Sequence, residues 1–308
     1  MRSGNRNSAA GALLLLCACG NLSNQDVAFL EGVPQKGALK LSVPKGDSAQ
    51  PVCAVGPADV FTSTKTTSDG INAGLDGILS LVDAIRSFPP STRSQDARTW
   101  GPWPDDKHPG VQFRVEISRE LDASGTPWRW IYDIAARRAP GDFLPIIEGE
   151  FFGAQARNGV GRLIIHFENS IALGINNLND PTLPARFYYD LSGDPRTISL
   201  DMTDNPLGFG LVGFDYFYAG YLDGHGRFDY ALPPDKNGCR SEVTTWFTVA
   251  GAGKATLHVH CGVFTLGDVI QCWDQSACLS YVDDPFAFTP SCGGVKPCKL
   301  GNIASCPF

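Results

Sequence analysis

The feature of this sequence that most restricts its fold is a period of two in hydrophobicity that begins near residue 111. A period of two places all the apolar side chains of a strand on one face of a sheet, and a polar second face is typical of antiparallel strands with one side in water. Turn signals rich in Gly, Asn, Asp and Ser separate the alternating segments. The sequence therefore predicts an antiparallel meander of roughly ten strands between residues 111 and 273. The alternation is clearest at 111–118, 162–168, 197–202, 227–232 and 256–261.

One segment before the meander has the period of a helix instead. Between residues 70 and 88, apolar residues recur every three or four positions, which places them on one face of a helix. Ser68 or Asp69 can cap its start, and Pro89 and Pro90 end it. The apolar stripe must be buried, so we expect this helix to lie against the sheet. The stripe consists of Ile71, Leu75, Ile78, Val82 and Ile85.

These two patterns together predict the fold class. A meander of this length usually curls or closes, because closure limits the exposed edges of the sheet. We therefore expect a mainly β fold: a long antiparallel meander that forms a curved sheet or (half-)barrel, with one N-terminal amphipathic helix on its concave apolar face. This shape is similar to the open half-barrels of periplasmic lipid carriers, a likeness of overall fold only.

The start of the chain has the pattern of a secretory signal peptide. Arg2 and Arg6 precede an apolar run at 9–16 that is too short to span a bilayer, and small residues follow it. The stretch Leu16-Cys17-Ala18-Cys19 resembles the lipobox of bacterial lipoprotein precursors, although Cys17 stands where a small or aliphatic residue is more usual. The resemblance implies that the chain is cut before Cys19 and that Cys19 is lipidated on its thiol and its new amine.

The same resemblance indicates where the mature chain resides. Gly20 follows the modified cysteine, in place of the Asp that retains lipoproteins in the inner membrane of enteric bacteria. We therefore expect a protein of the bacterial cell envelope, lipid-anchored, and in the outer membrane rather than the inner one. No second apolar run of spanning length is present, so the body is expected to be soluble and tethered.

The cysteine count supports the choice of Cys19. Besides the lipidated cysteine itself, a cut before Cys19 leaves eight cysteines, whereas a cut before Cys17 leaves nine. An even set in an exported protein predicts up to four disulfides. Cys261 and Cys272 lie symmetrically about an expected hairpin tip at 263–270, so we predict that they pair. The disulfide candidates are Cys53, Cys239, Cys261, Cys272, Cys278, Cys292, Cys298 and Cys306.

Composition gives the expected organisation and partners. We expect a signal peptide at 1–18, a spacer or tether at 19–69, a helix plus β-meander domain at 70–273 and a disulfide-rich C-terminal tail at 274–308. The net charge of −7 argues against a nucleic-acid partner, which would select a basic surface. The expected partners are a membrane, reached through the N-terminal lipid, and a hydrophobic ligand or an envelope protein.

Two groups of side chains could carry chemistry. Glu148 and Glu150 share one strand face, and paired carboxylates can act as acid and base in glycoside hydrolysis; solvated carboxylates on a polar face are the alternative. His258 and His260 share a strand face and could bind a metal, with His166 from another strand as a third ligand. The alternative is that these are ordinary polar strand positions, and no metal or cofactor is expected.

Aromatic residues offer a further candidate. Those at 187–189 and 209–221 are interpreted as core and half-exposed strand residues, with a platform for sugar or lipid as the alternative. The Trp100–Pro104 stretch is interpreted as a packed corner. The main hypothesis is a membrane-anchored lipoprotein with a binding or structural role, in which a hydrophobic ligand could lie between helix and sheet. The competing hypothesis is an extracytoplasmic hydrolase that uses Glu148 and Glu150, or a metal at His258 and His260.

Overall fold

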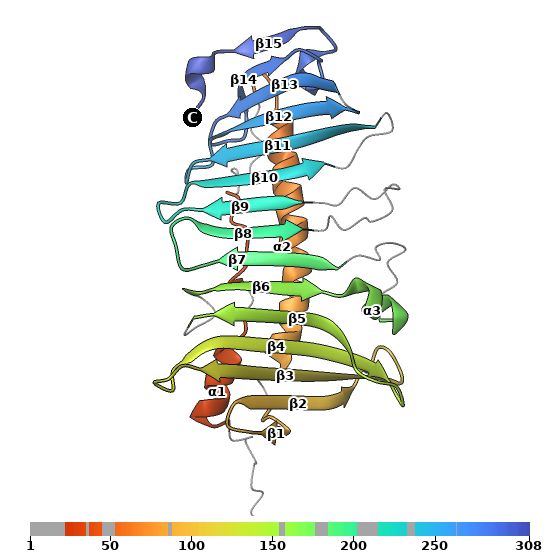
Figure 1. The fold of residues 1–308 in the computed structure, drawn as a ribbon. Coiled ribbons are helices and arrows are strands. Elements are labelled where there is room, and N and C mark those ends of the chain that lie inside the picture. The colour runs from red at the N-terminus through yellow and green to blue at the C-terminus, as the bar shows by residue number, and fades with distance from the viewer. Residues whose placement is uncertain are drawn as a thin grey trace, which may run out of the picture.

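A single sheet of fifteen antiparallel strands dominates the computed structural model (Figure 1). Each strand pairs with its neighbours in the chain, the sheet does not close, and the prediction of a mainly β meander is confirmed. Short turns suffice for antiparallel neighbours, which is why order in space follows order in sequence. The strands are β1 (Thr92–Arg93), β2 (Ala97–Pro104), β3 (Val111–Leu121), β4 (Pro127–Arg138), β5 (Leu144–Phe152), β6 (Val160–Ile165), β7 (Ala185–Asp190), β8 (Arg196–Asp201), β9 (Tyr216–Gly220), β10 (Gly226–Leu232), β11 (Cys239–Phe247), β12 (Gly253–Cys261), β13 (Phe264–Trp273), β14 (Leu279–Asp284) and β15 (Cys298–Gly301).

In the described part of the chain, three α-helices accompany the sheet: α1 (Asn24–Glu31), α2 (Asp59–Ile85) and α3 (Phe167–Ala172). Short 3₁₀ turns lie at Pro290–Cys292 and Ile303–Ser305. None of the helices in the described part of the chain combines the length and the apolar character needed to span a membrane. The structure describes residues 22–34, 37–44, 53–85, 88–153, 158–175, 184–201, 215–232, 238–262 and 264–308.

The long helix α2 crosses the strands on one face of the sheet (Figure 1). Near its start, the Val60 backbone N–H donates to Gln271 Oε1 on β13 at 3.3 Å. At its other end, Ile85 shares a cavity wall with Ile134 of β4. Its 27 residues give a length of about 40 Å, whereas fifteen strands about 4.8 Å apart extend for about 67 Å. The helix is therefore too short to cover the whole face.

The helix begins at Asp59 and not near residue 70, because packing on the sheet overrides the weak helix preference of a Thr- and Ser-rich segment. Its buried side includes Thr64, whose Oγ1 lies 3.1 Å from both the Tyr230 and the Thr245 hydroxyls. Ser68, an expected cap, is buried in mid-helix instead. A buried stripe that contains hydroxyls does not appear in a search for apolar periodicity.

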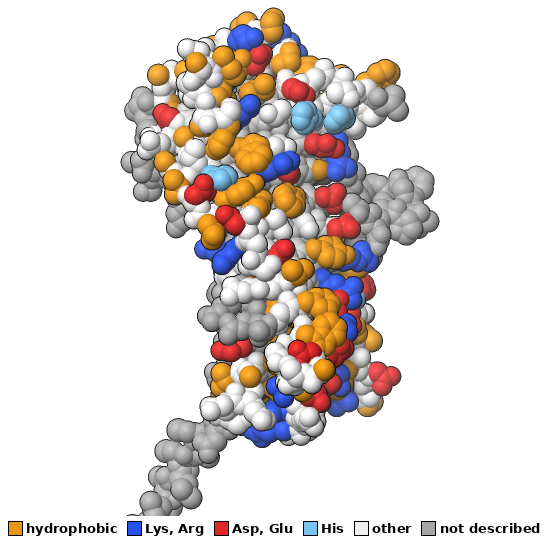
Figure 2. Space-filling view, turned by 60° about the vertical axis from the view of Figure 1, so that its left-hand side comes forward, with side chains coloured by type: hydrophobic (Ala, Val, Ile, Leu, Met, Phe, Trp, Pro, Cys, Tyr) orange, Lys and Arg blue, Asp and Glu red, His pale blue; other side chains and the backbone are white. Residues whose placement is uncertain are grey.

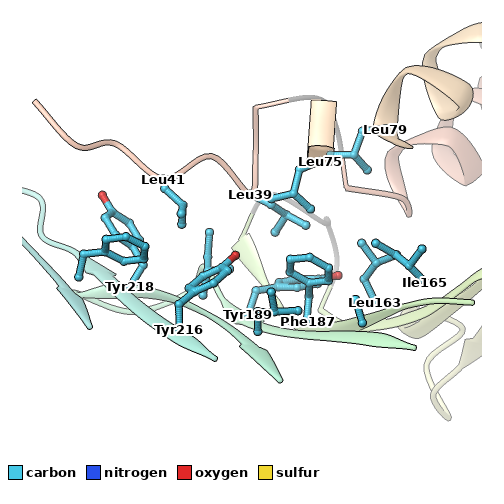
Figure 3. Packing of buried hydrophobic residues seen from close by; sticks show 14 of the residues in the cluster. Leu39, Leu41, Leu75, Leu79, Leu163, Ile165, Phe187, Tyr189, Tyr216 and Tyr218 are labelled. Atoms are coloured by element: carbon cyan, nitrogen blue, oxygen red, sulfur yellow. The ribbon is translucent and has the colours of Figure 1, made fainter. Parts of the chain in front are cut away.

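The segment 37–44 covers the face of the sheet beside α2. Asn72 of α2 holds this segment, since its side chain accepts from the Leu41 N–H at 2.8 Å and donates to the Leu41 carbonyl at 2.9 Å. Figure 3 shows side chains of α2 and of this segment pointing toward the rings and aliphatic side chains of β6, β7 and β9. The hydrophobic core is thus one layer between the sheet and what covers it.

The aromatic residues of β7 and β9 follow the alternation. Phe187, Tyr189, Tyr216 and Tyr218 are buried in the core, whereas Tyr188 and Phe217 are exposed on the opposite face. Residues 209 and 214, also part of the aromatic cluster in the sequence, lie outside the described residues. Figure 2 shows acidic and basic side chains intermixed along the molecule, with hydrophobic groups scattered among them.

The small helix α1 is fixed to β2 and β3 by a buried ion pair. Asp26 is fully buried, and its Oδ1 accepts from Arg98 Nε at 2.7 Å. Ser23 and Asp26 also form a capping box at the start of the helix. Phe29 packs edge-on against Trp130 of β4 at 5.5 Å between ring centroids, and the Arg98 guanidinium lies over its ring. Residues 22–34 therefore belong to the folded body.

The borders of the expected segments differ from those in the structure. The range 19–69, expected as a spacer, contains α1, the first turns of α2 and a disulfide from Cys53 to Cys278. The range 274–308, expected as a tail, adds β14 and β15 to the sheet. The backbone N–H and C=O groups along the edge of β13 need hydrogen-bond partners, and β14 supplies them.

Candidate functional site

An apolar cavity of about 730 Å³ lies beyond the C-terminal end of α2. This volume falls within the range of about 300–1,000 Å³ that is typical of ligand pockets. Among the described residues, α2 ends at Ile85 before the sheet does, and no helix covers the helix-facing side of β2–β5 at this point. Its apolar wall consists of Ile85, Phe88, Trp103, Pro104, Phe113, Val115, Ile134, Ile146 and Ile175.

The strand pattern explains why this wall is apolar. Val115 and Ile134 are opposite each other in β3 and β4, and both side chains point to the buried face. Phe88, just after the helix, is 53 % exposed, although its ring lies 6.3 Å from that of Trp103. An aromatic side chain that remains half in water beside a cavity is one that a bound apolar group could cover.

The charged residues of the cavity come from one turn, between β2 and β3. His108 Nδ1 lies 2.5 Å from Asp105 Oδ2, and Asp106 and Lys107 add one charge of each sign. Burial raises the pKa of the Asp105 carboxyl, but hydrogen bonds from His108 and the Lys107 backbone outweigh burial, so that this pKa lies below its ordinary value. Asp105 is therefore ionised at neutral pH and already bonded to His108. The turn at 105–108, which forms the charged rim of the cavity, carries no excess positive charge.

No protein-family model, curated protein or solved structure matches this chain. The likeness to periplasmic lipid carriers therefore stays a prediction. The functional argument rests on the cavity and on the chemistry of the residues around it.

Glu148 and Glu150 lie on the outer face of β5, away from the cavity. Glu150 is held between two arginines: its Oε2 accepts from Arg129 Nε at 2.9 Å, and its Oε1 lies 2.7 Å from Arg162 Nε. Glu148 Oε2 lies 2.7 Å from His166 Nε2. Two arginines thus neutralise Glu150, and His166 shares a hydrogen bond with Glu148. Both carboxylates also line a small hollow of about 170 Å³ on this face, so the hydrolase hypothesis stays a prediction.

The three histidines do not come together. His258 Nδ1 lies 2.7 Å from Asp268 Oδ1, whereas His260 Nδ1 lies 3.1 Å from Thr265 Oγ1. His166 does not belong to a strand face, because β6 ends at Ile165 and His166 precedes α3. It is separated from β12 by five strands, or about 29 Å. Within the described ranges, no group of His, Cys, Asp and Glu side chains could hold a metal ion.

All eight cysteines from Cys53 onward form disulfides, but the predicted pair Cys261–Cys272 is wrong. Residues 264–273 form a strand, so the turn lies near Gly262, and Cys261 is opposite Phe264. Cys261 is instead directly opposite Cys239 in the β11–β12 ladder. The pairs are Cys53–Cys278, Cys239–Cys261, Cys272–Cys306 and Cys292–Cys298. Four disulfides indicate an extracytoplasmic, oxidising location. Cys19 lies outside the described residues.

The cavity residues were missed at the sequence level. The Trp100–Pro104 stretch, predicted as a packed corner, is part of strand β2, whose register on β3 shifts between Trp100 and Trp103. Trp100 is fully buried, and its Nε1 donates to the Phe88 carbonyl at 3.0 Å. Trp103, three residues later, lines the cavity. A comparison of lengths could have indicated the cavity, because the predicted helix at 70–88 is too short to cross all the strands of the predicted sheet.

Proposed function

We propose that this chain is a lipoprotein of the bacterial outer membrane that binds a hydrophobic ligand in the cavity at the end of α2. The single observation that carries the proposal is the cavity of about 730 Å³ with its wall of Ile, Val, Phe and Trp side chains. Burying apolar surface releases about 25 cal/mol per Å², so a ligand that fills such a wall gains most from being apolar itself.

The charges favour a ligand that is neutral where it enters the cavity. Asp105 and His108 satisfy each other, and Asp106 and Lys107 balance. A buried carboxylate or phosphate needs a partner of opposite charge. An acyl chain, or another uncharged apolar group, is therefore the ligand class that fits this wall.

The position of the anchor supports exchange with a membrane. Cys19 precedes Leu22 by three residues, which span at most about 10 Å. Leu22 packs against the core, and α1 follows it directly onto β2 and β3. Trp130, which contacts α1, and Ile134, which lines the cavity, are four residues apart on β4, or about 13 Å. A lipid on Cys19 would hold the cavity end of the molecule near the bilayer.

Cavity filling tests the ligand site. We expect the neutral apolar fluorophore N-phenyl-1-naphthylamine to bind the protein, and Ile175→Trp to weaken binding about tenfold or more, because the larger ring occupies the space that the probe needs. Fluorescence titration measures both affinities.

The matched control is Val295→Trp, which adds the same ring at a site that is 67 % exposed and remote from the cavity. It should leave probe affinity unchanged, and both variants should unfold at the wild-type temperature. Equal affinity of the two variants, or no probe binding by the wild type, would refute the ligand site.

A labelling experiment tests the anchor. Cells that express the full chain should incorporate radiolabelled palmitate into the wild type and into Cys17→Ala, but not into Cys19→Ala, because only the Cys19 thiol and amine are acylated in this proposal. Label that survives Cys19→Ala would contradict the proposal, and so would a mature chain whose residue 19 has a free amine by mass spectrometry.

A further inference from the structure

A second cavity, of about 300 Å³, lies where the segment 37–44 meets the start of β8 and the turn between β9 and β10. It is separate from the apolar cavity, and none of its wall residues belongs to that site. Its size is at the lower end of the range for small-molecule pockets.

The charge of this cavity has one sign. Lys40 and Arg196 both line it, and no acidic residue is part of its wall. Within the described part of the chain, neither side chain has an ion-pair or hydrogen-bond partner. The nearby acids are already engaged: Asp194 Oδ1 accepts from the Leu222 N–H at 3.0 Å, and Asp223 accepts from His225. Both cationic side chains are exposed, so this cavity presents two unpaired positive charges to solvent in a chain of net charge −7.

One side of the cavity is a flat ring surface. The rings of Tyr221 and His225 are stacked, with 3.9 Å between centroids and 16° between planes. On the floor, the Tyr218 hydroxyl accepts from the Ser42 N–H at 3.2 Å, which fixes the segment 37–44 against β9. Three separate parts of the chain therefore bring the two exposed cationic side chains and the stacked rings to the same cavity.

We propose that this cavity binds a small soluble organic anion that combines a carboxylate or phosphate with a planar or apolar part. The anionic group would lie between Lys40 and Arg196, because a guanidinium can give it two parallel hydrogen bonds. The planar part would contact the Tyr221 and His225 rings, since aromatic faces favour offset stacking.

The test uses phenyl phosphate, which carries both features, and the full chain with its disulfides intact. Calorimetric titration should give saturable binding, with inorganic phosphate about tenfold weaker and benzyl alcohol undetectable. Arg196→Gln and Lys40→Gln should each weaken phenyl phosphate binding about tenfold, which corresponds to the loss of one charge-assisted hydrogen bond. The matched control is Lys254→Gln on β12, which should bind like the wild type.

Three outcomes would overturn the proposal. One is no saturable binding of phenyl phosphate by the wild type, and another is equal binding by the wild type, Arg196→Gln and Lys40→Gln. The third is that Arg196→Gln weakens binding to phosphatidylglycerol vesicles while binding to phenyl phosphate stays the same. This result would mean that the cavity recognises a lipid headgroup and not a soluble anion. A tenfold loss in both variants with Lys254→Gln unchanged would support it.

Discussion

Replacing Cys53 and Cys278 together by serine should lower the free energy of unfolding by about 5 kcal/mol. The two residues are 225 positions apart, so their bond restricts most of the unfolded chain, and in the chain-entropy account the effect rises with the logarithm of the loop length. The bond also holds the start of α2 on the sheet, where the Ala58 N–H donates to the Ala277 carbonyl at 2.9 Å. Urea unfolding under non-reducing conditions measures the loss.

The chain provides a matched control for this effect. Cys292 and Cys298 are only 6 positions apart, so the same double substitution there should cost about 2 kcal/mol. Both pairs remove one disulfide and add two serines. They differ in loop length and in burial, since Cys292 and Cys298 are buried whereas Cys53 and Cys278 are half-buried. Equal losses in the two double variants would show that loop entropy is not what this long-range bond contributes.

Replacing Asp26 by alanine should lower the free energy of unfolding by about 3–5 kcal/mol, because Arg98 would be left buried without a counter-charge. The control is Asp69→Asn, which removes an exposed partner of Lys65 and should cost at most about 0.5 kcal/mol. Urea unfolding gives both values. In a double-mutant cycle, the loss in the Asp26→Ala, Arg98→Ala variant should be smaller than the sum of the two single losses. Additive losses would contradict a direct ion pair.

The same carboxylate makes stability depend on pH. Burial raises the pKa of Asp26, but hydrogen bonds from Arg93, the Ser23 backbone and Arg98 outweigh burial, so that the pKa lies well below its ordinary value of 3.8. A lowered pKa means that the folded state holds the proton more weakly than the unfolded state. The contribution is therefore fully present above pH 3.8 and is lost as the pH falls toward the folded-state pKa. Asp26→Asn should lack this part of the acid-induced loss.

Much of the sheet could be predicted, and particular residues show why the rest could not. The alternation of Ile198 and Leu200 with Ser199 correctly assigned each side chain to a face, because period two is a local property of a strand. The start of α2 could not be predicted in this way. Thr64 is buried in the helix only because hydroxyls on β10 and β11 meet it there, and these lie more than 150 residues further along the chain.

The candidate site depended even more on distant parts of the chain. Ile85 and Val115 look like ordinary core positions in the sequence, and both are buried. They line a cavity because α2 ends where the sheet continues. Likewise, the partner of Cys261 follows from the register of β11 against β12, and a shift of the turn to Gly262 was enough to invalidate the local argument for Cys272.

The sequence by itself determined the antiparallel meander, a helix on its apolar face, the even set of cysteines from Cys53 onward and the expectation of a lipidated Cys19. These features depend on residues that are near one another in the chain or on a simple count. The tertiary structure decided which cysteines pair, where α2 begins, and where the sheet is left uncovered. Such features depend on how far each strand and helix extends in space relative to the others, and on the burial that results, which no short stretch of sequence specifies.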